Sequence, residues 1–502
     1  MELLYDIFST DMLPDAAYIT IFTMFVPLAG AFMASVIKSR DGRDIAVILT
    51  SIVLFVNVLN LLSIASKGGL PSLVLGEPIP GIKIMFFVDP YGAIFALVAS
   101  FLWIITSIYS VGYLHSNHEP HQNRFHAFFA LAIFAAMGIS FAGNMFTLFL
   151  FYEFMTLCTF PLVTHHGSKE ARIAGRTYLV ILLSTSILFL LTAILWTWSI
   201  AGTTDFEVGG ILAGKIGPVA TGILLMLYVY GVGKAALMPM HRWLPAAMVA
   251  PTPVSALLHA VAVVKAGVFT ILKVVVYIFG AKNLSEMISE NWWAGGWLVY
   301  IAGATIIISS IIALRQDNLK KRLAYSTISQ LSYVVMATAI LAPKAIMAAA
   351  FHIVAHAFGK ITLFFAAGSI YTAAHKKNIS ELNGIGRRMP YTMAAFTIGA
   401  LSVIGIPPAA GFLTKYYMML GAFEYGNFFA IIVIIISTVL NAAYFLPIIY
   451  AAFFKKEKGS PKHGEAPIAI IIALTITAGM TIGLFMFPDL FLWLGLQPVL
   501  AE

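Results

Sequence analysis

Five ionisable residues lie inside hydrophobic runs that are long enough to form membrane helices: Glu153, Lys234, Lys265, Lys360 and Lys415. Charged residues are scarce in the chain as a whole: 10% of its residues are charged and 60% are hydrophobic. A charge at bilayer depth costs about 2.5–3.5 kcal/mol on insertion scales. Five such residues, with histidines nearby, therefore predict a route for protons or cations through a membrane.

Histidines add titratable groups close to two of these lysines. His352, His356 and Lys360 are spaced by four residues, which puts them on one helix face. Because histidine titrates near neutral pH, this row predicts a proton relay. Two histidines at this spacing could also bind a metal, but no third ligand is visible, so no metal is expected. His259 precedes Lys265 by six residues, on a different helix face, and is either a core residue or part of a shared water-filled path.

Glu153 is the only acid well inside a predicted span. Desolvation would protonate it unless a cation lay nearby. Lys234 stands just before a proline-rich segment, and a desolvated lysine can release a proton under modest bias. We therefore expect Glu153 and Lys234 to form an electrostatically coupled pair near the membrane midplane. The alternatives are a fixed ion pair that orients two helices, or a Lys234 side chain that snorkels to the interface beside Arg242.

Lys415 follows Pro407 and Pro408, so it mirrors Lys234 in the other half of the chain. Its position predicts a terminal proton-loading group. Lys273 stands towards the outer end of its predicted span and is expected to snorkel. Asp89, at the edge of another span, is expected to be an interface or cap residue.

Hydrophobic runs recur along the whole chain, mostly near or above the roughly 20 residues that a bilayer requires. This pattern predicts an all-α polytopic membrane protein with about fourteen transmembrane helices. The expected spans are 16–37, 45–65, 84–113, 126–143, 145–164, 177–202, 217–244, 254–279, 296–314, 323–342, 345–374, 390–421, 427–454 and 466–495.

The basic residues are distributed unevenly between the two sides of these spans. Of the 30 lysines and arginines, 20 fall in the loops of one side and five in those of the other, and the remaining five lie within spans. By the positive-inside rule, the richer side is cytoplasmic. An even number of spans then predicts that both termini lie outside. We expect a multi-pass protein of the prokaryotic inner (plasma) membrane.

Two spans, the seventh and the twelfth, are long and contain prolines that are expected to break them. An offset of five spans predicts two five-helix repeats of opposite orientation. The whole chain, 1–502, is then a single membrane domain. Its expected parts are helices 1–3 over about 1–125, a first repeat of helices 4–8 over about 126–280, an inverted second repeat of helices 9–13 over about 296–455, and helix 14 over about 466–495.

Several protein classes are excluded by the same features. The connections between spans are short, so no soluble domain is expected. The net charge of +8 lies in loops beside the membrane, so it does not indicate nucleic acid. The single cysteine, Cys158, excludes an internal disulfide, and no Cys/His cluster resembles a metal or iron–sulfur site. No cofactor is expected, and the acidic N-terminal segment does not resemble a cleavable signal peptide.

Three segments resemble the antiporter-like subunits shared by respiratory complex I, Mrp-type cation/proton antiporters and membrane-bound hydrogenases. They are GKAALMPMHRWLPAAMVAPTPVSALLHAVAVVKAG, GIPPAAGFLTK and KKRLAYSTISQLSYV, and the resemblance is strongest from about 85 to 420. It implies fourteen core helices with inverted repeats. It also implies that Glu153 and Lys234 are a switch pair, Lys265 a central lysine and Lys415 a terminal residue of the path.

The resemblance implies a proton- or Na⁺/H⁺-translocating subunit whose partners are other membrane subunits, with any oxidoreductase chemistry in those partners. HIVAHAFGK looks like the largest subunit of complex I and its Mrp counterpart, whereas the chain length is similar to that of shorter subunits. Three alternatives stay open. They are a self-sufficient ion-coupled transporter, a membrane subunit of an inorganic-carbon uptake system with a soluble zinc protein, and a scaffold whose charges are fixed pairs.

Overall fold

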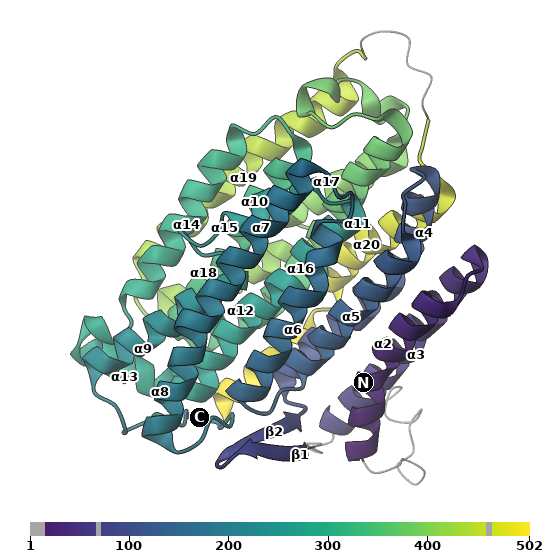
Figure 1. The fold of residues 1–502 in the computed structure, drawn as a ribbon. Coiled ribbons are helices and arrows are strands. Elements are labelled where there is room, and N and C mark those ends of the chain that lie inside the picture. The colour runs from purple at the N-terminus through teal and green to yellow at the C-terminus, as the bar shows by residue number, and fades with distance from the viewer. Residues whose placement is uncertain (1–15, 67–71, 458–463, 502) are drawn as a thin grey trace.

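The computed structural model describes residues 16–66, 72–457 and 464–501. Long helices run side by side through the molecule, and a two-stranded hairpin lies at one end of them (Figure 1). Within the described residues, eleven helices are long and apolar enough to cross a membrane. The expected all-α polytopic class is confirmed, while the count of fourteen crossings stays a prediction. The N-terminus, and Lys67, Lys458 and Lys462 of the charge distribution, lie outside the described residues.

The first part of the chain contains two outer helices, the hairpin and a buried helix. They are α2 (Ala16–Val36), α3 (Arg40–Ser66), β1 (Ser72–Ile79), β2 (Ile82–Phe87) and α4 (Pro90–Ser116). The strands are antiparallel, with Ser72 opposite Phe87. The expected span 84–113 began too early, because its first residues belong to β2. Asp89 is the N-cap of α4, as expected of a cap residue, and its Oδ1 accepts from the amide of Gly92 at 3.0 Å.

The next part comprises α5 (Gln122–Ser140), α6 (Met145–Val163) and a long helix that was expected only from 177. That helix consists of α7 (Lys169–Thr185), a π-helical segment (Ser186–Leu190) and α8 (Leu191–Ala201). It begins early because Ser168 caps it, accepting from the amide of Ala171 at 3.1 Å. Because the first turn of this helix is polar and basic, the hydropathy pattern does not show where the helix begins.

Both expected helix interruptions are confirmed. The first lies between α9 (Pro218–Gly231) and α10 (Trp243–Ala246), and the second between α17 (Pro390–Ile404) and α18 (Ala410–Glu424). Lys234 was expected to precede its break, which was wrong: α9 ends at Gly231, and Lys234 lies in a 3₁₀ turn, Gly233–Ala235. The backbone of this turn packs directly on Gly267, where an added Cβ would lie 2.3 Å from the amide nitrogen of Ala235. The helix thus ends before the first proline of the interruption, Pro239.

Two helices form the centre of the bundle. One is composite, with α11 (Thr252–Ala256), a π-helical segment (Leu257–Val261), α12 (Val263–Lys273) and a second π-helical segment (Val274–Phe279). The other is α16 (Pro343–Ala374). The most apolar 18-residue stretch of each is entirely buried. The polar side chains on these two helices are therefore shielded from lipid by protein.

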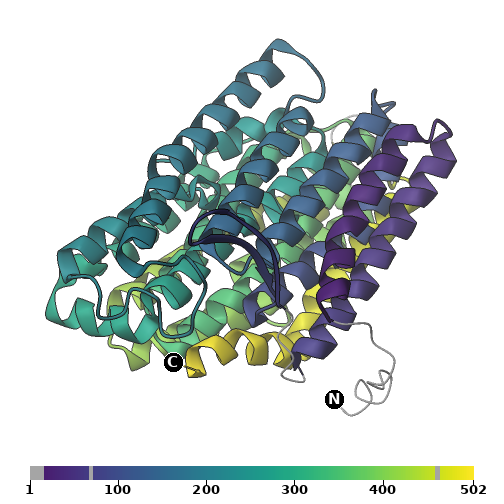
Figure 2. The ribbon, with the colours of Figure 1, turned by 60° about the horizontal axis from the view of Figure 1, so that its bottom comes forward.

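The rest of the described chain surrounds this centre. It consists of α13 (Ala281–Glu290), α14 (Trp297–Leu314), α15 (Leu319–Ala339), α19 (Phe428–Phe454), α20 (Ile468–Met486) and α21 (Asp489–Leu500). The single span expected over 466–495 was wrong, since the chain turns at Pro488. Figure 2 shows α21, in yellow beside the C-terminus, lying across the ends of other helices. It packs on α16, with 6.3 Å between the ring centroids of Phe351 and Phe491.

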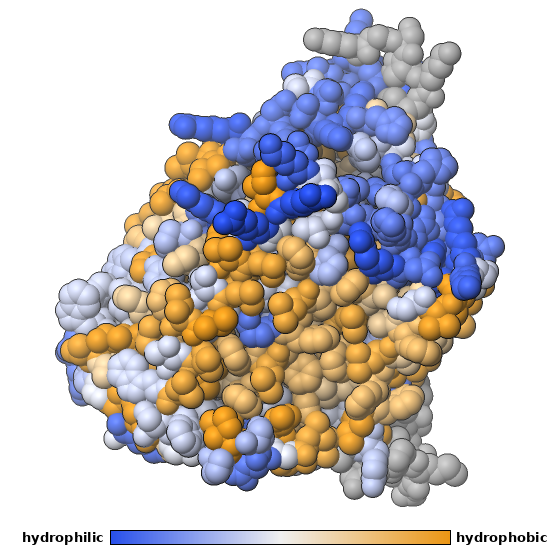
Figure 3. Space-filling view, viewed as in Figure 1, coloured by the Kyte–Doolittle hydropathy of each residue, from blue (hydrophilic) through white to orange (hydrophobic). Residues whose placement is uncertain are grey.

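The surface has the polarity of a membrane protein. In Figure 3, hydrophobic side chains cover a broad area of the visible face, and hydrophilic ones gather above it. That hydrophilic end corresponds to the upper end of α19 and the loop before α17 in Figure 1.

Candidate functional site

The central contact joins the two buried helices. Lys265 Nζ of α12 lies 2.6 Å from His356 Nδ1 of α16, and both residues are buried. Lys265 stands at the start of the regular part of its helix, just after Ala262, whose φ of −125° and ψ of −66° interrupt it. An irregular backbone in a membrane helix is tolerated where protein buries it. This irregularity lets the Lys265 turn be positioned independently of the segment before it.

The row of titratable residues predicted on one face is formed by α16. The imidazoles of His352 and His356 are nearly parallel, with ring centroids 5.9 Å apart. His352 Nδ1 lies 2.8 Å from the hydroxyl of Thr414 on α18, and its ring stacks on Tyr333 at 5.8 Å. The row therefore extends the Lys265 contact from α12 towards the second broken helix.

Lys415, the residue after Thr414, completes this series of contacts. Its ammonium donates to the carbonyl of Ile404 at 2.7 Å and to the Thr438 hydroxyl at 3.2 Å. It also lies 5.0 Å from the ring centroid of Tyr333. Ile404 is the last residue of α17, where a helix has carbonyls without partners inside it. The break thus supplies the acceptor for Lys415, as its position after the Pro-Pro pair predicted.

Lys360, the third member of the row, points to a different neighbour. Its ammonium donates to the hydroxyl of Ser326 on α15 and lies 3.5 Å from the carbonyl oxygen of Leu323. The side chain is buried, and neither of these hydrogen bonds is to His356. Lys360 thus has polar neighbours inside the protein and does not point into lipid.

Lys234 and Glu153 are not joined by a direct ion pair, contrary to the fixed-pair alternative. Lys234 Nζ donates to the Tyr152 carbonyl at 2.7 Å and to the Thr156 hydroxyl at 2.6 Å. Residues 152 and 156 share one face of α6, whereas a neighbouring residue points about 100° away. Glu153 is half-buried, and its Oε1 is a buried atom without a hydrogen-bond partner among the described residues. A coupling of the two charges stays a prediction.

His259 is buried in the π-helical segment before Lys265. Its ring packs against Phe364 at 4.8 Å, and both ring nitrogens lack a hydrogen-bond partner in the described part of the chain. Buried polar atoms without partners require an explanation, and water is the usual one. The role of His259 as a relay stays a prediction. Among residues 16–66, 72–457 and 464–501, no group of three His, Cys, Asp or Glu is arranged to hold a metal ion.

One buried ion pair was missed. Lys273 was expected to snorkel, which was wrong: its ammonium lies 2.5 Å from Asp89 Oδ2, and both side chains are buried. Lys273 also donates to the Ala142 carbonyl at 3.1 Å and lies over the ring of Phe206 at 4.1 Å. The capping acid of α4 was visible in the sequence. Its partner was not, because 184 residues separate them.

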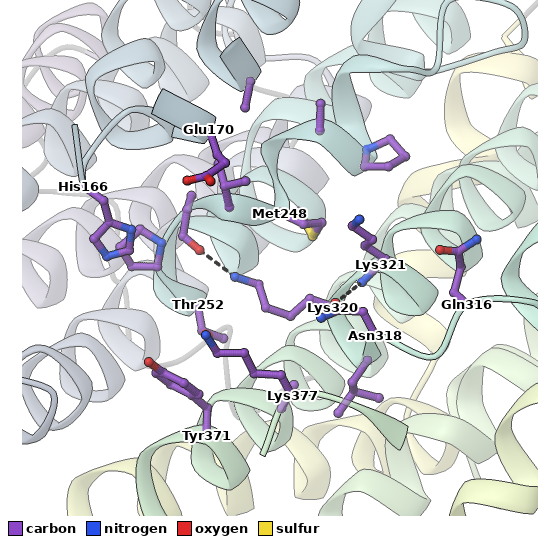
Figure 4. A pocket seen from close by; sticks show the side chains of 18 of the residues that line it. His166, Glu170, Met248, Thr252, Gln316, Asn318, Lys320, Lys321, Tyr371 and Lys377 are labelled. Carbon is purple, nitrogen blue, oxygen red and sulfur yellow. Dashed lines mark hydrogen bonds between the residues drawn. The ribbon is translucent and has the colours of Figure 1, made fainter. Parts of the chain in front are cut away.

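A cavity of about 700 Å³ opens among α7, α10, α11 and α15, on the side that is rich in lysine and arginine. Four lysines line it: Lys320, Lys321, Lys376 and Lys377. Figure 4 shows Lys320 extending across the cavity; its ammonium donates to the carbonyl of Ala250 at 2.5 Å. Hydropathy and motif patterns do not reveal such a cavity, because it forms only where several helix ends meet.

Titratable groups stand at the rim of this cavity. His166 Nε2 lies 3.1 Å from Glu119, and both residues line the cavity. Burial lowers the pKa of the adjacent His165 to about 4, because it outweighs the attraction of Glu119. His165 is therefore neutral at physiological pH. Thr252 also lines the cavity and begins α11, the short segment that precedes the π-helical turn carrying His259.

Two family models match the chain. Residues 142–441 match the model described as NADH:quinone oxidoreductase/Mrp antiporter, TM. Residues 81–126 match the model described as NADH-Ubiquinone oxidoreductase (complex I), chain 5 N-terminus. The first match covers more than half of the chain and includes all the candidate site residues.

Curated relatives come from both branches of that description. NADH-quinone oxidoreductase subunit N of Desulforudis audaxviator is 31% identical over 79% of this chain and 77% of its own length. NADH-quinone oxidoreductase subunit L of Rickettsia bellii is 30% identical over 92% of this chain and 74% of its own length. An Na(+)/H(+) antiporter subunit of Alkalihalophilus pseudofirmus is 30% identical, with 90% and 59% covered, so this chain matches little more than half of that protein.

Solved structures have the same fold. One chain of the archaeal membrane-bound sulfane sulfur reductase complex is 25% identical, with a TM-score of 0.83, 96% of this chain covered and 97% of that chain. One chain of the Mrp complex from Dietzia sp. DQ12-45-1b has a TM-score of 0.85 and 97% coverage of both chains, at 20% identity.

Proposed function

Because the chain belongs to the family of NADH:quinone oxidoreductase and Mrp antiporter membrane subunits, we propose that it translocates protons as one subunit of a multi-subunit membrane complex. The observation that carries this proposal is the buried contact series Lys265–His356–His352, with Lys415 beyond it. All four residues lie on helices in the protein interior.

The chemistry of this series suits proton transfer. The ammonium of Lys265 can donate to His356 Nδ1, and the ring can then release its other proton from Nε2. That nitrogen, like Nε2 of His352, is a buried atom without a partner among the described residues. Water bridging these atoms would complete the path to Lys415. Imidazole and amine nitrogens are poor ligands for Na⁺, a hard cation that prefers oxygen, so we propose H⁺ as the ion carried here.

The remaining predicted residues have roles at the ends of this path. We propose that protons enter from the basic cavity past Thr252 to His259, and that Lys360 and Lys265 receive them. Lys234 lies in the turn between α9 and α10, and its protonation would respond to the charge of Glu153. Lys415 would be the terminal group. The cavity side is then cytoplasmic, and both termini lie outside, in the arrangement of two inverted repeats over about 126–280 and 296–455.

The test is proton transport by the chain reconstituted with its partner subunits in liposomes. Lys265→Ala and His356→Phe should each reduce proton translocation by at least about tenfold, since each removes a buried group that binds the proton. Lys344→Ala is the control, because Lys344 forms an exposed ion pair with Glu424 away from the path. Wild-type transport in both path variants would refute the proposal.

Liposomes that contain the chain without its partner subunits test the self-sufficient alternative. The chain reconstituted alone should not build a proton gradient when an ion gradient is imposed, because the subunit depends on a partner's driving reaction. Gradient-driven transport by the isolated chain, lost in Lys265→Ala, would instead establish an independent secondary transporter.

A further inference from the structure

A groove of about 410 Å³ lies between α6 and α7, on the opposite side of α7 from the large cavity. Arg172 and Arg176 line one part of it, and the other lining residues are Phe160, Thr164, Gly167, Leu179 and Val180. None of these residues belongs to the proposed proton path. The groove therefore requires an explanation of its own.

The cationic part of the groove is formed by two arginines one helical turn apart. Positions 172 and 176 share a face of α7. Both residues are exposed, and neither forms an ion pair with a carboxylate in the described part of the chain. Glu170, in the first turn of α7, lines the other cavity and forms no ion pair with either arginine. Two unpaired guanidinium groups present forked donors that match the oxygens of a phosphate.

The apolar part of the groove continues along α7 in the direction of the membrane. Leu179 and Val180 follow Arg176 by one turn, and the Val180 side chain is 56% exposed. The floor is closed by a tight helix contact: a Cβ added at Gly175 would lie 2.3 Å from Thr164 Cγ2 and 2.8 Å from Phe160 Cε2. The groove thus changes from charged to apolar over about two helical turns, or roughly 10 Å.

We propose that this groove binds an anionic phospholipid. Its phosphate lies between Arg172 and Arg176, and one acyl chain runs along Phe160, Leu179 and Val180. Charge complementarity favours an anionic lipid, since basic pockets beside membrane helices bind such headgroups. The apolar extension favours a lipid over a free anion, because a free anion would leave that part of the groove empty. This inference is independent of the proposed proton path.

Native mass spectrometry of the full-length chain in detergent tests the proposal. Phosphatidylglycerol and phosphatidylcholine with identical acyl chains are added, and the retained lipids are counted. Arg172→Gln/Arg176→Gln should weaken binding of the first phosphatidylglycerol by about tenfold or more, because it removes the charge-assisted hydrogen bonds to the phosphate. Lys455→Gln/Lys456→Gln removes the same charge at two exposed residues outside the groove, and its lipid binding should match wild type.

A second pair of measurements separates lipid from free anion. Inorganic phosphate at millimolar concentration should not displace the retained phosphatidylglycerol, and Arg172→Lys/Arg176→Lys should bind it with intermediate affinity. Unchanged lipid retention in Arg172→Gln/Arg176→Gln would overturn the proposal. Displacement of the lipid by inorganic phosphate would also overturn it, in favour of a soluble anion. The two arginines are exposed, so the thermal midpoint of the variant should equal that of wild type and exclude misfolding as a cause.

Discussion

The buried lysines of the described chain fall into two kinds. In the first kind, the ammonium hydrogen-bonds with neutral groups, namely hydroxyls, backbone carbonyls or an imidazole; these are Lys234, Lys265, Lys360 and Lys415. Lys273 instead forms an ion pair with Asp89. A buried ammonium next to neutral groups carries a desolvation cost that is relieved when it loses its proton, whereas a carboxylate holds the proton in place. This difference separates groups suited to proton transfer from a pair that fixes structure.

The ion pair between Asp89 and Lys273 should therefore matter for stability. Lys273→Met leaves a buried carboxylate without its cation, which costs about 3–5 kcal/mol. Asp89→Asn/Lys273→Met removes both charges and retains an oxygen that can cap α4, so its loss should be clearly smaller. Thermal unfolding of the three proteins in the same detergent measures this. Equal losses in the single and double variants would contradict the expectation that the unpaired carboxylate causes the loss.

Proton translocation should depend on the ability of Lys415 to release a proton, and not only on its positive charge. Lys415→Arg keeps the positive charge but does not deprotonate, so proton translocation should fall by at least about tenfold while the complex assembles normally. Lys415→Glu should retain partial transport, since a carboxylate can also carry a proton. Lys344→Arg, at an exposed ion pair, is the control. An unchanged rate in Lys415→Arg would place the terminal group elsewhere.

At the scale of elements, the second helix break depends on a glycine. Gly405 has a φ of +88°, which residues with a side chain rarely adopt, and an added Cβ would lie 2.7 Å from Lys415 Cδ. The carbonyl of the preceding Ile404 accepts from Lys415. Gly405 therefore both ends α17 and leaves room for the lysine that uses its end.

Gly405→Ala should impair transport more than stability. The left-handed backbone costs about 1–2 kcal/mol in any variant with a side chain, but here the methyl group also displaces Lys415. Gly426→Ala is a matched control, with a φ of +66° and no atom within 4 Å of the added Cβ. Comparable thermal midpoints with transport lost only in Gly405→Ala are expected. Equal transport in the two variants would contradict the role of this glycine.

Much of the element pattern was predictable, and the exceptions have physical causes. Apolar runs and prolines located the long helices and both breaks. They did not reveal that β2 precedes α4, or that Pro488 divides the last run into α20 and α21. The sequence stays apolar across these segments while the backbone conformation changes. Hydropathy therefore does not mark where one element ends and the next begins.

Site residues were easier to predict than their contacts. Charges within apolar runs identified Lys265, His356 and Lys415, because such residues are rare at bilayer depth. The partner of Lys234 could not be inferred, since residues 152 and 153 are adjacent in sequence but lie on different faces of α6. Long-range pairs such as Asp89 with Lys273, and the cavity lined by helix ends, depend on packing that no local pattern encodes.

At the scale of the whole molecule, the two central helices carry most of the titratable path and also contribute residues to the lining of the basic cavity. The two central helices are buried in the bundle and meet at the contact between Lys265 and His356, and other helices surround them. Lys321 lines the cavity at the start of α15, whereas Lys344 lies at the start of α16, the next helix. The helix α15 has 21 residues and is roughly 30 Å long, about the thickness of a bilayer core, so it separates the two lysines.

The orientation of the chain can be tested with these two lysines. In a Cys158→Ser background, which leaves no native thiol, Lys321→Cys should react with a membrane-impermeant maleimide in inside-out vesicles and not in right-side-out vesicles. Lys344→Cys should show the opposite pattern. The reason is the excess of basic residues in the loops on the Lys321 side, which the positive-inside rule assigns to the cytoplasm. Both side chains are exposed, so reagent access does not limit either reaction. Labelling of both cysteines from one side would mean that α15 does not cross the membrane, and a reversed pattern would put the basic cavity outside.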